Sequence, residues 1–320
     1  MIVGFMIAAY AIISNDAIQT LGTFLASNSH RPAWLLWIFA TVVLVGTVLY
    51  SYFAFGGDVS QGRLTKFPPV EHFHWIYIVP PILILILTRF GIPVSTSFLI
   101  LTVFSTATLD KMLQKSLFGY FVAFVVAILI YRLVMATFEK RFAANQSQGI
   151  PGYWVGLQWF STAFLWSQWL GQDLANIFVY APSAGFNEFG VRTIDPYWLV
   201  GSLAWMVFIL GMVFWRKGGK IQNIVDVKTN IHDIRSATII DLMYGVILYI
   251  FKVQSNIPMS TTWVFLGLLA GREFALALAS KPKTTGRAFS MITSDIGKAT
   301  IGLILSVAIA ILAPYIMTLA

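Results

Sequence analysis

Two apolar stretches of the chain each begin with a proline, Pro93 or Pro258, and three hydroxyl-bearing side chains. The two triplets are Ser95, Thr96 and Ser97, and Ser260, Thr261 and Thr262. Proline is tolerated in the first turn of a helix, so each triplet is predicted to lie where a helix begins. Free backbone N–H groups, the positive end of the helix dipole and three hydroxyls together suit a tetrahedral oxyanion. The alternative is that the hydroxyls only cap their own helices.

Two other apolar stretches are interrupted by an aspartate beside carboxamides. The residues are Asn15, Asp16 and Gln19 in the first stretch and Gln172, Asp173 and Asn176 in the second. An ionised Asp near the bilayer centre costs about 2.5–3.5 kcal/mol even on the mildest scale, so such residues are candidates for function. Their oxygens form a set that coordinates Na⁺, and either carboxylate can instead carry H⁺. The alternative is a pair of hydrogen-bonded clamps between helices.

Three more charged residues fall within or near the apolar stretches. Arg89 and Lys252 each precede a hydroxyl triplet by a few residues, where a positive charge would attract an anion. Asp241 lies 17 residues ahead of Pro258, and near the second triplet it would bind a cation or hold a positive residue. The four histidines show no metal-ligand spacing within a span, and cysteine is absent. We therefore expect no cofactor apart from a transported coupling ion.

The elements that must position these residues are membrane helices. Of the 320 residues, 58% are apolar and 11% are charged, and the mean hydropathy is +0.78. Soluble domains carry about 25% charged residues. The chain is therefore predicted to be an all-α integral membrane protein with about ten to twelve transmembrane segments. This length leaves no room for a sizeable soluble domain, and the net charge of +8 is attributed to loops rather than to nucleic-acid binding.

The order of the polar motifs predicts an internal duplication. The two aspartates are 157 residues apart and the two prolines 165 residues apart, which divides the chain into repeats at 1–145 and 146–320. Broken helices at the bilayer midplane are expected at the interrupted stretches, and an odd number of crossings per half would invert the second repeat.

Loop charges support this inversion with both termini outside. Eleven basic residues would lie inside: Arg31, Lys140, Arg141, Arg216, Lys217, Lys220, Lys228, Arg235, Lys281, Lys283 and Arg287. Five would lie outside: Arg63, Lys66, Lys111, Lys115 and Arg192.

These motifs resemble those of the inorganic phosphate transporter family. Residues 15–23 and 171–176 resemble its duplicated Gly-x-Asn-Asp-x-x-Asn signature, and residues 93–97 and 258–262 resemble its Pro-x-Ser-Thr-Thr-His signature. The four motifs occur in family order and span nearly the whole chain. The resemblance implies an inverted-repeat secondary transporter whose Ser-Thr turns hold the anion and whose Asp/Asn motifs serve the coupling cations. Some bacterial relatives that are similar in sequence carry sulfate.

This chain departs from the family pattern at several positions. Gln19 and Gln172 replace expected asparagines, Val179 replaces a glycine, and Phe98 and Trp263 replace the closing histidines. The identity of the oxyanion and of the cation therefore stays open.

The leading expectation is a symporter of inorganic phosphate in the cytoplasmic membrane, coupled to Na⁺ bound at Asp16 and Asp173 or to H⁺. A sulfate symporter is the nearest alternative, and an oxyanion channel is a second one. An enzyme is disfavoured because no nucleophile is paired with a base. The expected partners are the oxyanion and the lipid bilayer, and a homodimer is left open.

Overall fold

The computed structural model describes residues 2–70, 72–90, 92, 94–132, 151–216, 234–279 and 282–319. The predicted boundary between the halves, at residues 145 and 146, lies outside these ranges, as does Pro93. So do six of the basic residues assigned to inner loops: Lys140, Arg141, Lys217, Lys220, Lys228 and Lys281. The division into two repeats therefore stays a prediction.

The described chain is almost entirely helical. Its α-helices are α1 (Ile2–Ser27), α2 (Ala33–Ala54), α3 (Val79–Arg89), α4 (Thr96–Phe104), α5 (Leu109–Ile130), α7 (Tyr153–Phe178), α8 (Pro196–Trp215), α10 (Ile234–Gln254), α11 (Thr261–Ala279) and α12 (Pro282–Leu319). Two short 3₁₀ helices are η1 (Leu64–Lys66) and η2 (Trp75–Ile78). Strands β1 (Ser183–Phe186) and β2 (Arg192–Ile194) form an antiparallel hairpin in which Ser183 is opposite Ile194 and Phe186 is opposite Arg192.

Several helices are suited to a membrane. By length and composition, five helices of the described chain can cross one: α2, α5, α8, α10 and the Ile292–Met317 part of α12. The bent helix α1 raises the number to six. Helices α3 and α4 have 11 and 9 residues, well below the roughly 20 that a full crossing needs. The protein is thus a helical, membrane-embedded chain in which α3 and α4 are each too short to cross a membrane alone.

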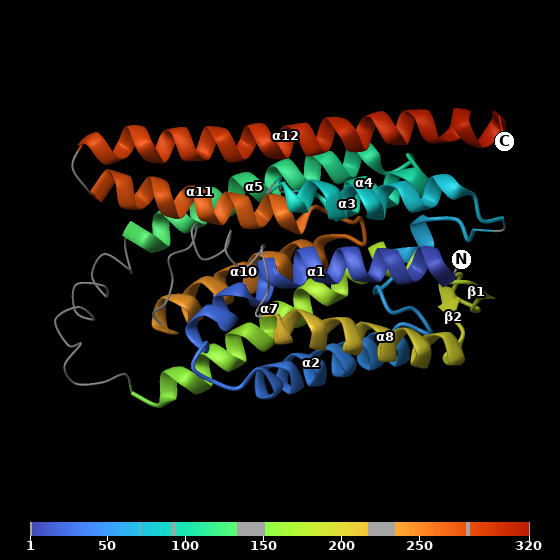
Figure 1. The fold of residues 1–320 in the computed structure, drawn as a ribbon, viewed down its shortest axis with the longest axis horizontal. Helices are drawn as coiled ribbons and strands as arrows, with labels where there is room; N and C mark the ends of the chain where they lie inside the picture. The colour runs from blue at the N-terminus through green and yellow to red at the C-terminus, as the bar shows by residue number, and fades with distance from the viewer. Residues whose placement is uncertain are drawn as a thin grey trace.

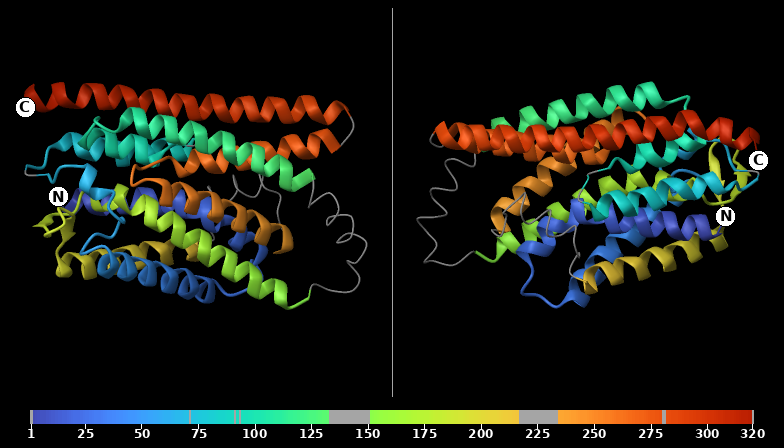
Figure 2. Two further views of the ribbon diagram at one scale, coloured as in Figure 1. Left: turned by 180° about the vertical axis from the view of Figure 1, so that it is seen from behind. Right: turned by 45° about the horizontal axis from the view of Figure 1, so that its top comes forward.

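The helices form two layers that run along the long axis of the molecule (Figures 1 and 2). One layer holds α3, α4, α5, α11 and α12, and the other holds α1, α2, α7, α8 and α10. Each layer combines helices from both halves of the sequence: α5 packs extensively on α11, and α7 packs on α10, α1 and α2. The two halves are therefore interleaved rather than side by side. Helix α1 begins and α12 ends at the same end of the bundle, beside the hairpin (Figure 1).

The two interrupted stretches behave differently. Helix α1 bends by 52° between its Ile2–Ala17 and Gln19–Ser27 parts, directly after the Asn15-Asp16 pair. The Thr20 hydroxyl donates to the carbonyl oxygen of Ala17 at 2.9 Å, a back-bond that often bends helices. The predicted interruption at Gln172-Asp173 is wrong, because α7 continues as an α-helix through Phe178. After Phe178 the helix ends, and the chain enters β1 at Ser183.

Glycines allow a close helix contact in the layer that contains α5 and α11. Gly267 and Gly271 on α11 lie four residues apart and face the backbone carbonyl groups of Tyr120 and Phe124 on α5. A side chain at either glycine would collide with that backbone. This spacing of small residues brings two membrane helices to close approach and fixes α11, which carries the second hydroxyl triplet.

Candidate functional site

The two hydroxyl triplets lie where the sequence predicts helices to begin. Ser95 precedes α4 in an extended conformation, and its Oγ accepts a hydrogen bond from the Phe98 N–H at 3.3 Å. Ser260 precedes α11, and its Oγ accepts from the Trp263 N–H at 3.2 Å. The first hydroxyl of each triplet is therefore an N-cap, as the alternative interpretation requires, while the other two are free for different contacts.

The third hydroxyl of each triplet reaches across to the opposite turn. Ser97 Oγ lies 3.2 Å from the Met259 carbonyl oxygen, and Thr262 Oγ1 donates to the Val94 carbonyl oxygen at 3.1 Å. Each acceptor belongs to the residue that follows the proline of the other motif. Each turn therefore contacts the other through its third hydroxyl, which faces a backbone carbonyl oxygen of the opposite turn.

The second hydroxyl of each triplet lies near an aspartate. Thr96 Oγ1 donates to Asp16 Oδ2 at 2.6 Å, and Thr261 lies near the Asp173 side chain. Ser97 Oγ also lies 3.0 Å from Asp173 Oδ1. Both carboxylates are buried, with exposed fractions of 0% and 1%. The structure thus brings the two predicted hydroxyl turns and the two predicted aspartates into one buried cluster, which is the candidate site.

The carboxamides connect the same groups. Asn176 Nδ2 lies 2.9 Å from Asp173 Oδ1, 3.1 Å from Ser97 Oγ and 3.2 Å from Thr96 Oγ1. Around the other carboxylate, the side-chain nitrogen atoms of Asn15 and Gln19 donate to Asp16 Oδ1 at 2.5 and 3.4 Å. In both motifs an amide three residues after the aspartate therefore bonds back to it.

The first carboxamide of each motif also faces the helix that leads to the hydroxyl turn. Asn15 Oδ1 accepts from Thr88 Oγ1 on α3 at 2.8 Å, and Gln172 Nε2 donates to the Leu248 carbonyl oxygen on α10 at 2.8 Å. Gln172 is thereby turned partly away from Asp173.

Three buried oxygen atoms of the second motif have no hydrogen-bond donor in the described part of the chain. They are Gln172 Oε1, Asp173 Oδ2 and Asn176 Oδ1. Buried acceptors without a donor are unusual, because each loses its contact with water. Carboxylate and carboxamide oxygens are ligands for hard cations, so this set fits Na⁺, and a protonated carboxyl group would also satisfy part of it.

Asp241 is hydrogen-bonded to two threonines of other helices. Its Oδ1 accepts from Thr23 on α1 at 2.5 Å and its Oδ2 from Thr162 on α7 at 2.6 Å. Both oxygens are satisfied by threonine hydroxyls, and these hydrogen bonds involve neither a positive residue nor the Ser260–Thr262 turn. Asp241 therefore joins α1, α7 and α10 as a buried crosslink.

Arg89 and Lys252 are not ligands of the hydroxyl turns in this conformation. Arg89 is exposed at the end of α3, and the Lys252 ammonium lies 5.6 Å from the centre of the Tyr249 ring. Lys115 on α5 is closer to the second turn: its Nζ donates to the carbonyl oxygens of Ser255 and Ile257 at 3.2 and 2.9 Å. It thereby fixes the segment that enters α11.

The segment that follows α2 is buried, which its sequence did not indicate. Arg63 and Arg192, assigned above to outer loops, are both fully buried. Asp58 holds the turn before Arg63: its carboxylate accepts from the Ser60 N–H at 2.7 Å, the Ser60 hydroxyl at 2.8 Å and the Gly62 N–H at 2.5 Å. Burial raises the pKa of Asp58, while these hydrogen bonds and the Arg63 charge oppose that increase.

The glycines of this segment could have indicated a tight turn. Gly56, Gly57 and Gly62 all adopt positive φ, as does Gln61 at 57°, in a region that strongly favours glycine.

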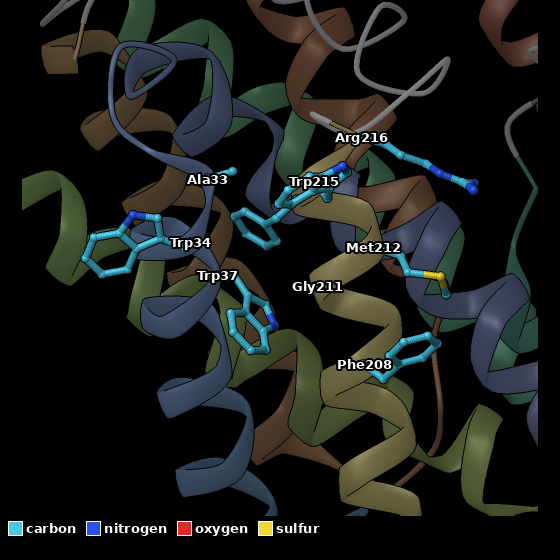
Figure 3. A pocket seen from close by; sticks show the side chains of 9 residues that line it. Ala33, Trp34, Trp37, Phe208, Gly211, Met212, Trp215 and Arg216 are labelled. Carbon is cyan, nitrogen blue, oxygen red and sulfur yellow. The ribbon is translucent and has the colours of Figure 1, made fainter.

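The groove shown in Figure 3 is separate from this cluster. It has a volume of about 490 Å³ and lies between α2 and α8, lined by Trp34, Trp37, Phe208, Met212 and Trp215 among others. None of the hydroxyl or aspartate motifs contributes to it. Its apolar lining on two candidate spans matches the hydrocarbon that surrounds a membrane helix, so we do not assign the substrate to it.

Comparisons of the chain with protein-family models, with curated proteins and with solved structures find no match.

Proposed function

We propose that the protein is a cation-coupled symporter of inorganic phosphate in the cytoplasmic membrane. The observation that carries the proposal is the convergence of four motifs, far apart in sequence, on one buried cluster. Hydroxyls suited to an oxyanion and carboxylates suited to cations are directly bonded there, as in Thr96 with Asp16. A transporter of the inorganic phosphate transporter family, which these motifs resemble, needs both kinds of group in one site.

The geometry supplies a physical reason for coupling. A phosphate dianion at the hydroxyl turns would lie beside Asp16 and Asp173, and the repulsion inside a low-dielectric interior would be severe. Cations or protons bound at the two carboxylates remove this repulsion. The membrane potential adds about 2.3 kcal/mol per charge per 100 mV against entry of an anion. Cotransported positive charge is thus needed both for binding and for accumulation.

The reciprocal contacts of Ser97 with Met259 and of Thr262 with Val94 support an inverted repeat, for which the sequence predicts ten to twelve crossings. A pseudo-two-fold axis through the cluster would relate them. The cluster lies between the two layers, since α4 and α11 supply the hydroxyls and α1 and α7 the aspartates. Rocking of one layer against the other would expose the site to alternate sides of the membrane.

Phosphate is preferred to sulfate because of the unpartnered acceptor oxygens. Hydrogen phosphate carries a hydroxyl that can donate to Asp173 Oδ2, whereas sulfate offers acceptors only. Buried acceptors left without a donor discriminate strongly against a ligand that lacks the hydrogen.

The test is uptake of labelled phosphate into proteoliposomes. We expect accumulation only when a Na⁺ or H⁺ gradient is imposed, with excess unlabelled sulfate competing weakly. Asp16→Asn and Asp173→Asn should abolish coupled uptake, while Asp110→Asn, a change at an exposed position at the start of α5, should not. Uptake that ignores both gradients would favour a channel, and stronger competition by sulfate would favour the sulfate symporter.

A further inference from the structure

Arg63 is a buried guanidinium in a segment without regular structure between α2 and η1. Its exposed fraction is 0%, and its Nη1 donates to the carbonyl oxygens of Ser60 at 3.1 Å and Gly171 at 2.9 Å. Gly171 lies two residues before Asp173 on α7. The Gln61 side chain packs on the same glycine, where an added Cβ would meet its Nε2 at 2.9 Å. Arg63 is therefore anchored to the backbone at the start of the second aspartate motif.

Two of its nitrogen atoms, Nε and Nη2, have no hydrogen-bond partner in the described chain. In a guanidinium group the Nε–H and one Nη2–H point the same way and form a bidentate edge. Such an edge matches two oxygens of a carboxylate or phosphate. A buried charge with unmet donors is strongly unfavourable unless a partner satisfies it. The geometry and the positive charge of this unpartnered edge of Arg63 therefore suit it to bind an oxyanion.

Arg192 provides an internal contrast. It is also fully buried, and its Nη2 donates to the Ala181 carbonyl oxygen at 2.7 Å. Its unpartnered atoms are Nε and Nη1, whose hydrogens lie on different edges of the guanidinium. Two oxygens of one ligand cannot be held by both. Of these two arginines, only Arg63 has both nitrogen atoms of one edge without any partner in the described chain.

The surroundings of Arg63 belong to the candidate site. Its positive charge interacts with Asp173, and also with Lys115 and Lys252. The neighbouring Gly62 packs against Asn256 in the connection to the second hydroxyl turn, where an added Cβ would lie 2.8 Å from Asn256 Nδ2. The segment thus contacts both the second aspartate motif and the approach to the second hydroxyl turn.

We propose that Arg63 binds the transported oxyanion directly, donating from Nε and Nη2 to two of its oxygens. The inference rests on the function proposed above and adds a ligand that the resemblance does not supply. Arg63 contributes a fixed positive charge beside Asp173, so one positive charge of the loaded site comes from the protein rather than from a transported ion. A bidentate edge can donate to two oxygens of a tetrahedral oxyanion, whereas a halide ion offers only one acceptor atom. The edge therefore favours the oxyanion.

The test compares Arg63→Lys and Arg63→Gln with Arg192→Lys in coupled phosphate uptake. Lysine keeps the charge but loses the edge, so we expect the KM for phosphate to rise roughly 10-fold or more in Arg63→Lys, and further in Arg63→Gln. The half-saturating cation concentration measured at saturating phosphate should change much less. Arg192→Lys should keep the phosphate KM of the unmodified protein. Unchanged phosphate KM in both Arg63 variants would overturn the inference.

A second measurement does not depend on the variants. In the unmodified protein with ¹⁵N-labelled arginine, bound phosphate should show a ³¹P–¹⁵N dipolar coupling to a guanidinium that appears only with the coupling cation present. Absence of the coupling at saturating phosphate would overturn the role of Arg63 while leaving phosphate transport intact. If the unmodified protein neither binds nor transports phosphate, the proposed function itself fails.

Discussion

Thr96 and Asp16, eighty residues apart in sequence, are joined by a hydrogen bond of 2.6 Å between Oγ1 and Oδ2. The hydroxyl that would bind the oxyanion is therefore held by the carboxylate that would bind the cation. A cation or proton at Asp16 weakens the attraction of the carboxylate for this hydroxyl and frees the hydroxyl to donate to the anion. The two binding events are thus linked through one shared hydrogen bond.

We predict that Thr96→Val raises the KM for phosphate, whereas Thr96→Ser retains most of the affinity. Valine is similar in shape to threonine but has no donor, and a hydrogen bond to a charged group contributes about 1.5–3 kcal/mol. The increase should be roughly 10-fold or more, measured in proteoliposomes under a saturating cation gradient. Equal KM values for the two variants would show that this hydroxyl does not contact the substrate.

The cross-turn contacts predict effects on stability at both turns. Ser97→Ala and Thr262→Val each remove a hydroxyl that faces a carbonyl oxygen of the opposite turn. Thr262→Val should lower the free energy of unfolding in detergent by about 1 kcal/mol, the usual contribution of one such bond. Ser97→Ala should lower it by at least as much, because the Ser97 hydroxyl also contacts Asp173 and Asn176. Thr262→Ser should be near neutral. A loss confined to one of the two positions would argue that the two turns are not equivalent.

Helix packing predicts opposite outcomes for two glycine substitutions. Gly271→Ala places a Cβ against the Phe124 backbone and 2.8 Å from Ala127 Cβ, so it should destabilise the protein by about 1–3 kcal/mol. Gly46→Ala, on α2, meets nothing within 4 Å and should be neutral or stabilising because alanine favours helices. Thermal unfolding of the two variants in one detergent makes the comparison. Similar melting temperatures would contradict the close contact of α5 and α11.

Asp58 predicts a pH dependence of stability. Burial raises its pKa in the folded protein, so the folded state binds a proton more readily than the unfolded state does. Between the ordinary pKa of about 3.9 and the raised folded-state pKa, the folded protein binds more protons than the unfolded chain. The free energy of unfolding therefore increases as pH falls through this range and decreases as pH rises through it. The melting temperature of the unmodified protein relative to Asp58→Asn should accordingly increase as pH is lowered from neutral. A constant difference across this range would show that Asp58 does not titrate in this way.

The sequence by itself determined the membrane character and the starts of α4 and α11. Apolar composition requires burial in lipid, and a proline followed by serine and threonine favours a helix N-terminus locally. It also identified the aspartates and carboxamides that meet in the cluster, since unpaired polar groups are costly in such surroundings. Each of these inferences depends on a local property of the chain.

How these groups are satisfied depends on contacts between distant segments. Helix α7 continues unbroken through Asp173, whose Oδ1 is met by Ser97 of α4 and by Asn176 of α7 itself, so no change of its own backbone is required. Asp241 is bound by two threonines from other helices, one of them 218 residues away. Arg63 is buried because the turn held by Asp58 brings it to the Gly171 carbonyl on α7. Such contacts join segments distant in the chain, and neither composition nor periodicity encodes them.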